Sequence, residues 1–198
     1  MEESTQPTIY DHVYTAERPE VFFKATPQRV VGPGEPVRVR RDSRWHVPEP
    51  EFALVINQSL ELVGYTIGND MSARDIEGDN PLYLPQAKIY MGCCALGPVI
   101  RLADPAAPHE HFEMAMAVER AGQVIFQGRT STAQMARSFA DLIRYLGIDN
   151  AFPEGVVLLT GTGIIPPDDF SLEAGDRVHM NVPGIGVLSN PVRRGWPG

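Results

Sequence analysis

Short apolar stretches alternate with polar residues and turn residues along most of the chain, and this pattern predicts a strand-rich fold. Residues 51–56 and 61–68 have the character of two strands joined by a turn at residues 57–60, which predicts a hairpin. Residues 112–118 and 124–127 predict a second hairpin around the turn dipeptide Ala121-Gly122. Further strands are expected over residues 21–24, 37–40, 156–159 and 177–182, and residues 90–102 are apolar and small.

Helical spacing of apolar residues occurs convincingly in one place, over residues 132–146. Ser131 and Gln134 resemble a capping box before this segment, and Gly147 suits its C-terminal end. The coarse prediction is therefore an α+β, β-rich domain with about ten strands and one main helix.

Composition and charge narrow the class of protein further. The 198 residues, of which 43% are hydrophobic, are enough for one domain with its own core. The net charge of −8 argues against nucleic acid or an anionic membrane as a partner, and no apolar run reaches the ~20 residues of a membrane helix. The N-terminus has no signal-peptide pattern, and the adjacent Cys93 and Cys94 provide no disulfide framework, so we expect a cytoplasmic protein.

The chemical signal of the sequence is a set of carboxylates. Glu49 and Glu51 alternate in a predicted strand, so they point to the same face, and Asp70 follows the next strand of the hairpin. If the hairpin forms, the three carboxylates converge and would hold a hard cation, Mg²⁺ or Mn²⁺. The alternative is a solvated strand edge with Asp70 in a turn, and the spacing alone leaves both open.

Several motifs together resemble the fumarylacetoacetate hydrolase family. Residues 64–75 (GYTIGNDMSARD) resemble its signature, and the upstream Glu-x-Glu pair and residues 159–163 (LTGTG) follow its order. Residues 18–24 (RPEVFFK), 45–51 (WHVPEPE) and 75–90 (DIEGDNPLYLPQAKIY) are most similar to its 2-keto-3-deoxy-arabinonate dehydratase branch.

This resemblance implies a mixed β-roll, a Mg²⁺ or Mn²⁺ ion at the three carboxylates, and a homodimer or higher homo-oligomer. It implies a catalytic domain over residues 20–198, preceded by a partly disordered extension over residues 1–19. The expected substrate is a small 2-oxo acid, a 2-keto-3-deoxy sugar acid, which the enzyme dehydrates to 2,5-dioxopentanoate through a metal-stabilised enolate.

The resemblance also places side chains near the substrate. Lys88 is expected as the base that takes the C3 proton and Glu20 as the acid at the C4 hydroxyl, with the reverse assignment open. Lys24 and Thr162 are expected to bind the substrate. Gln86 joins them on a different ground, because it would share the face of Lys88 if that segment is extended.

Other functions remain open from the sequence. The same scaffold supports acylpyruvate-type C–C hydrolysis, or decarboxylation or isomerisation of a 2-oxo acid. Longer dehydratase-like members carry an N-terminal domain before the segment that matches residue 18 onward, so a substrate contact from that domain would have to come from elsewhere. A non-catalytic module that binds a metabolite or pairs with another subunit is the alternative of another class.

Overall fold

Two five-stranded sheets make up most of the molecule. The computed structural model describes residues 16–106 and 111–197. The first sheet has the order β1 (Val30–Val31), β5 (Cys94–Leu102), β4 (Leu62–Ala73), β3 (His46–Ile56) and β8 (Val156–Leu159). The second has the order β2 (Val37–Val39), β10 (Gly186–Arg194), β9 (Arg177–Val182), β6 (Glu113–Arg120) and β7 (Gln123–Ser131).

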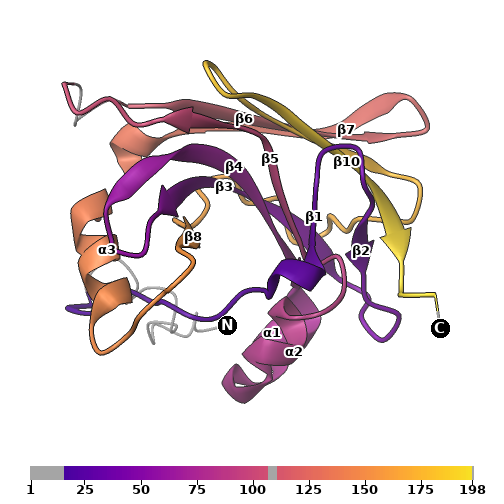
Figure 1. Ribbon diagram of the computed structural model, residues 1–198. Helices are drawn as coiled ribbons and strands as arrows, with labels where there is room; N and C mark the ends of the chain where they lie inside the picture. The colour runs from indigo at the N-terminus through magenta and orange to yellow at the C-terminus, as the bar shows by residue number, and fades with distance from the viewer. Residues whose placement is uncertain (1–15, 107–110, 198) are drawn as a thin grey trace, which may run out of the picture.

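The sheets curve over one another as a mixed β-roll, with the core between them (Figure 1). Most neighbouring strands are antiparallel, while β1 pairs with β5 and β2 with β10 in parallel. The core consists of the alternate apolar residues that each strand turns toward the opposite sheet. Its largest fully buried members include Leu54, Ile67, Met71, Met116, Met180 and Leu188.

Three α-helices accompany the sheets in the described residues. Helices α1 (Arg74–Asp79) and α2 (Leu84–Lys88) follow β4 directly, and α3 (Phe139–Gly147) lies at the far side of the roll from them (Figure 1). Short 3₁₀ turns occur at η2 (Pro27–Arg29), η3 (Pro81–Tyr83) and η4 (Thr132–Gln134). No helix in these residues is long and apolar enough to cross a membrane.

The fold confirms the predicted β-rich α+β class and both hairpins. Strands β3 and β4 pair antiparallel across the turn at residues 57–60, and β6 and β7 pair across Ala121-Gly122. Ala121 and Gly122 have φ values of 51° and 79°, which is the left-handed pair that a tight hairpin turn requires. The predicted strands at residues 156–159 and 177–182 are confirmed as β8 and β9.

Four sequence expectations need correction. The predicted helix over residues 132–146 is shorter and begins later, at Phe139, because Ser138 caps α3 by accepting from Asp141 N, and the Ser131 side chain caps only η4. Residues 21–24 form no strand, and β10 was not predicted. Residues 80–88, where we expected irregular structure, contain α2, and α1 before them was not predicted. Most of the expected N-terminal extension, residues 1–15, lies outside the described residues.

Candidate metal centre

The β3–β4 register brings the predicted carboxylates together. Glu49 lies directly opposite Asp70, and Glu51 lies opposite Gly68 on the same face. One carboxylate oxygen from each acid lies within 4.8 Å of the others, and the three side chains belong to residues only 3–7% exposed. Like charges directly opposite one another destabilise a sheet, and burial increases that cost. Because all three acids are buried, the alternative of a solvated strand edge is wrong.

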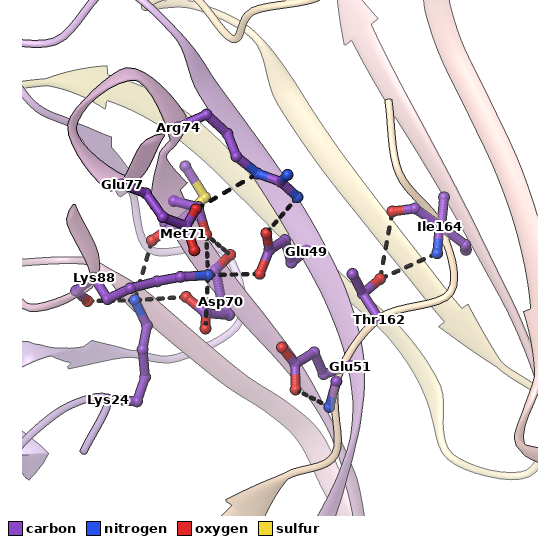
Figure 2. Close-up of polar contacts among 12 residues, drawn as sticks. Lys24, Glu49, Glu51, Asp70, Met71, Arg74, Glu77, Lys88, Thr162 and Ile164 are labelled. Atoms are coloured by element: carbon purple, nitrogen blue, oxygen red, sulfur yellow. Dashed lines mark hydrogen bonds and ion pairs between the residues drawn. The ribbon is translucent and has the colours of Figure 1, made fainter. Parts of the chain in front are cut away.

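Lys88 is a cation that contacts two of the three acids. It lies at the end of α2, and its Nζ donates to Glu49 Oε2 at 2.7 Å and to Asp70 Oδ2 at 3.3 Å (Figure 2). The same Nζ donates to Ser72 Oγ at 2.5 Å. All three acceptors lie on β3 and β4, so the ammonium group connects α2 to the centre of the first sheet.

Two further cations flank the cluster. Arg74 donates to Glu49 Oε1 at 2.7 Å. Lys24 Nζ lies 2.7 Å from Asp70 Oδ1, but it directs its hydrogen bonds to the backbone carbonyls of Met71 and Lys88 (Figure 2). When all groups are ionised, three positive charges face the three carboxylates of the cluster, and Glu77, 3.8 Å from Arg74, adds a fourth negative charge.

These contacts shift the pKa values of two of the carboxylates in opposite directions. Burial would raise the pKa of Glu49, but the charges of Lys88 and Arg74 outweigh burial and hold that pKa below its usual value. Burial, followed by the charges of Asp70 and Glu49, raises the pKa of Glu51 to about 8. Glu51 accepts one hydrogen bond, from Gly161 N to its Oε2 at 2.5 Å, which offsets only part of this effect.

Lys88 is a cation in this arrangement. Burial alone would lower its pKa, but the carboxylates of Asp70, Glu49 and Glu77 act in the opposite direction and raise the pKa above its ordinary value. A neutral Lys88 amine therefore requires that the negative charge of its partners be offset by another cation.

The residues fit a divalent cation. The donor set is entirely carboxylate oxygen, which favours Mg²⁺ or Mn²⁺ over softer metals. Ligands of an octahedral Mg²⁺ are about 3 Å apart when adjacent and about 4.2 Å apart when opposite, and the three oxygens all lie within 4.8 Å of one another. Asp70 Oδ1 is buried, and the Lys24 ammonium group lies 2.7 Å from it, so a cation already pairs with this oxygen. Glu49, Glu51 and Asp70 would hold the ion.

A cavity of about 1430 Å³ opens onto this cluster. Its lining includes Glu20, Lys24, Lys88 and Thr162, so the structure brings four of the five predicted catalytic and substrate-binding residues to one space. Glu20 is exposed on the segment before η2. The Thr162 hydroxyl accepts from Ile164 N at 3.2 Å and lies in the loop that also contacts Glu51 (Figure 2).

Gln86 is the predicted residue that the structure does not bring to this cavity. The expectation assumed an extended segment, but residues 84–88 form α2, where positions two apart point in nearly opposite directions. Gln86 is exposed, whereas Lys88 is buried. The assumption of a shared face is therefore wrong.

Sequence reasoning assigned no chemical role to three other residues of the site. Ser72 and Arg74 contact Lys88 and Glu49, and Glu77 lines the cavity beside them. The alternation of side chains along a strand could have predicted the position of Ser72, since it lies two residues after Asp70 on the same face of β4. Arg74 and Glu77 belong to α1, which was not predicted. Strand alternation therefore could not predict their positions.

The mixed β-roll and its buried carboxylate cluster define a class of protein with an oxygen-ligand cation site at the mouth of a large cavity. Comparison with protein families narrows this class, because residues 8–193 match the model of the "Fumarylacetoacetate (FAA) hydrolase C-terminal" family. The chain therefore belongs to this family, and the predicted resemblance is confirmed.

Its similar proteins include named dehydratases. The chain is 53% identical to a "Probable 2-keto-3-deoxyxylonate dehydratase" of Haloferax volcanii, over 96% of this chain and 66% of that protein. It is 48% identical to a "2-dehydro-3-deoxy-D-arabinonate dehydratase" of Saccharolobus solfataricus, over 94% of this chain and 63% of that protein. The chain thus spans just under two thirds of the length of these relatives.

A solved structure agrees with the sequence relatives. The structure described as "2-keto-3-deoxy-D-arabinonate dehydratase complexed with magnesium and 2,5-dioxopentanoate" superposes with a TM-score of 0.93 at 46% identity, covering 99% of this chain and 70% of that one. The predicted fold is therefore that of the family.

Proposed function

We propose that this chain catalyses the Mg²⁺- or Mn²⁺-dependent dehydration of a 2-keto-3-deoxy sugar acid to 2,5-dioxopentanoate. The observation that carries the proposal is the convergence of three buried carboxylates and two lysines at one cavity. The similarity to dehydratases named for 2-keto-3-deoxy pentonic acids supports the substrate class.

Dehydration of such an acid requires two proton carriers, one at C3 and one at the departing C4 hydroxyl. When bound at Glu49, Glu51 and Asp70, a divalent ion would supply a Lewis acid for the negative charge that develops as the C3 proton leaves. We assign the C3 proton to Lys88 and the C4 hydroxyl to Glu20, with the reverse assignment as the alternative.

The remaining contacts orient the substrate. Lys24 supplies a positive charge beside Asp70, held in place by two backbone carbonyls. Thr162 supplies a hydroxyl on the loop that borders the cavity. Arg74 fixes one oxygen of Glu49 and so orients the other toward Lys88. We therefore propose Lys24 and Thr162 as substrate contacts and Arg74 as a positioning residue.

The purified chain tests the proposal directly. With 2-keto-3-deoxy-D-arabinonate and Mg²⁺, we expect formation of 2,5-dioxopentanoate, which the aldehyde signal in proton NMR detects. With a chelator, we expect no product. Lys88→Ala should abolish turnover without preventing metal binding. Gln86→Ala, an exposed change on the same helix α2, is the matched control and should retain activity.

Two results would redirect the proposal. Cleavage of an acylpyruvate in preference to the sugar acid would favour the hydrolase alternative, and metal binding without turnover of either substrate would favour the non-catalytic module. A homodimer or higher homo-oligomer and a cytoplasmic location stay predictions, and sedimentation of the purified chain checks the first.

A further inference from the structure

The two lysines of the chain have an unusual distribution. Lys24 and Lys88 are the only lysines among the 17 Lys and Arg residues of the sequence. Their side chains are 10% and 4% exposed, and both contact the carboxylate cluster. A lysine is normally a surface residue, so a chain that uses arginine everywhere else and lysine only here points to a specific use of the ammonium group.

The Lys88 ammonium group lies where a divalent cation would be held. Its Nζ contacts one oxygen of Glu49 and one of Asp70, at 2.7 and 3.3 Å, and these two residues belong to the candidate ligand set. A divalent cation that coordinates these same two oxygens at about 2.1 Å would take the space that the ammonium group holds between them and would neutralise most of the negative charge that attracts it. The two cations therefore exclude each other at this position.

The third contact of Lys88 has a different character. Ser72 Oγ accepts from Lys88 Nζ at 2.5 Å, is fully buried, and is a neutral hydroxyl outside the candidate ligand set. It can therefore keep its hydrogen bond to Lys88 after the two carboxylates have been taken by a metal ion.

We propose that Lys88 Nζ is the resident cation of the metal-free site, that a divalent ion must displace it from Glu49 and Asp70, and that Ser72 Oγ retains the displaced amine beside the cavity. This inference rests on the proposed metal site and adds a positioning role for Ser72. Binding of the metal ion thereby releases Lys88 toward the cavity. The two requirements of the reaction, the divalent ion and the Lys88 base, are therefore met together.

Lys24 provides a matched comparison within the same chain. Its Nζ also lies beside Asp70, but it donates to the backbone carbonyls of Met71 and Lys88, which are not candidate ligands. Lys24 therefore adds positive charge near the site without occupying the place between two ligands. An effect of charge alone would act through both lysines, whereas competition for the position between two ligands acts through Lys88, because Lys24 contacts one ligand and Lys88 contacts two.

The first test is the affinity of the whole chain for Mn²⁺, measured by isothermal titration calorimetry. We expect Lys88→Met to bind Mn²⁺ about tenfold more tightly than the unchanged protein, and Lys24→Met to change the affinity less than about threefold. Equal or weaker binding by Lys88→Met overturns the inference, as does an equal gain in both variants. This test does not measure turnover. If the protein is an active dehydratase but gives either of these results, the competition is refuted and the proposed function is not.

The second test needs no substitution at Lys88. Protein labelled with ¹⁵N at lysine Nζ has two ammonium signals, because the chain has two lysines. Saturating Mg²⁺ should move the Lys88 signal much further than the Lys24 signal. In Ser72→Ala the Lys88 signal of the Mg²⁺-loaded protein should be lost to exchange with water, while Mn²⁺ affinity stays within about twofold and kcat falls more than KM changes. An unmoved Lys88 signal, or one unaffected by Ser72→Ala, overturns the inference.

Discussion

The first sheet is buried on both faces, but its two faces are stabilised in opposite ways. One face packs Phe52, Leu54 and Ile67 against the second sheet, where burial itself is favourable. The other face buries Glu49 and Asp70, where burial is costly and cations must offset it. Because side chains alternate along β3 and β4, neighbouring residues serve stability and chemistry separately, and a substitution on one face should leave the property of the other intact.

The largest expected effect comes from removing a charge on the acidic face. Asp70→Asn should lower the turnover of the metal-loaded protein about a thousandfold, because a ligand charge is lost from the cation site. It should also eliminate the rise in melting temperature that Mn²⁺ causes in the unchanged protein. Glu61→Gln, at the exposed turn of the same hairpin, is the control. A retained Mn²⁺ shift in Asp70→Asn would contradict the assigned ligand set.

The converse substitution lies on the apolar face. Leu54→Ala removes a fully buried side chain and should destabilise the fold by about 3 kcal/mol, through lost transfer free energy and the cavity left behind. Urea unfolding measures this loss, and Val124→Ala, at a residue that is 56% exposed, should cost little. Below the unfolding transition, the Mn²⁺ affinity of Leu54→Ala should be unchanged, and a large change would refute the independence of the two faces.

Glu51 tests the cost of the acidic face itself. Its folded-state pKa of about 8 lies above the ordinary 4.5, so the fold favours the protonated acid. The stability of the metal-free protein should therefore be greatest below about pH 4.5 with respect to this group and should fall as the pH rises toward 8. Glu51→Gln should flatten this decline and raise stability at pH 8 by about 2 kcal/mol.

Urea unfolding in the presence of a chelator, from about pH 5 to pH 8, measures this difference. Addition of Mn²⁺ should reverse the order of the two proteins, because only the unchanged protein keeps the full ligand set. An equally steep pH dependence in Glu51→Gln would show that another group causes the decline.

The sequence predicted the parts of the molecule that depend on alternation and on short turns. Strand periodicity fixed the face of Glu49 and Glu51, and the hairpin turn fixed Asp70 beside them. It did not predict α1 and α2, because these segments are too short for helical periodicity to be read. As a result the position of Lys88 was predicted only through the family resemblance, and Gln86 was placed on the wrong face.

His46 gives the smallest expected effect in the comparison of the two faces, because it is a titratable residue on the apolar face. It is fully buried next to Ala73 on β4. Burial, with a smaller effect of Arg194, lowers its pKa below 6.5. The fold therefore favours neutral His46, so its contribution to stability is present above pH 6.5 and is lost as the pH falls through the lowered pKa.

We expect His46→Phe, which keeps an apolar ring, to remove about 1 kcal/mol of the stability loss between pH 7 and pH 5. His179→Gln, at a half-buried histidine beside Glu119, is the matched control and should leave that loss in place. Urea unfolding across this range measures both. If His46→Phe keeps the full acid sensitivity, the loss belongs to the carboxylates, and the apolar face carries no part of the pH dependence.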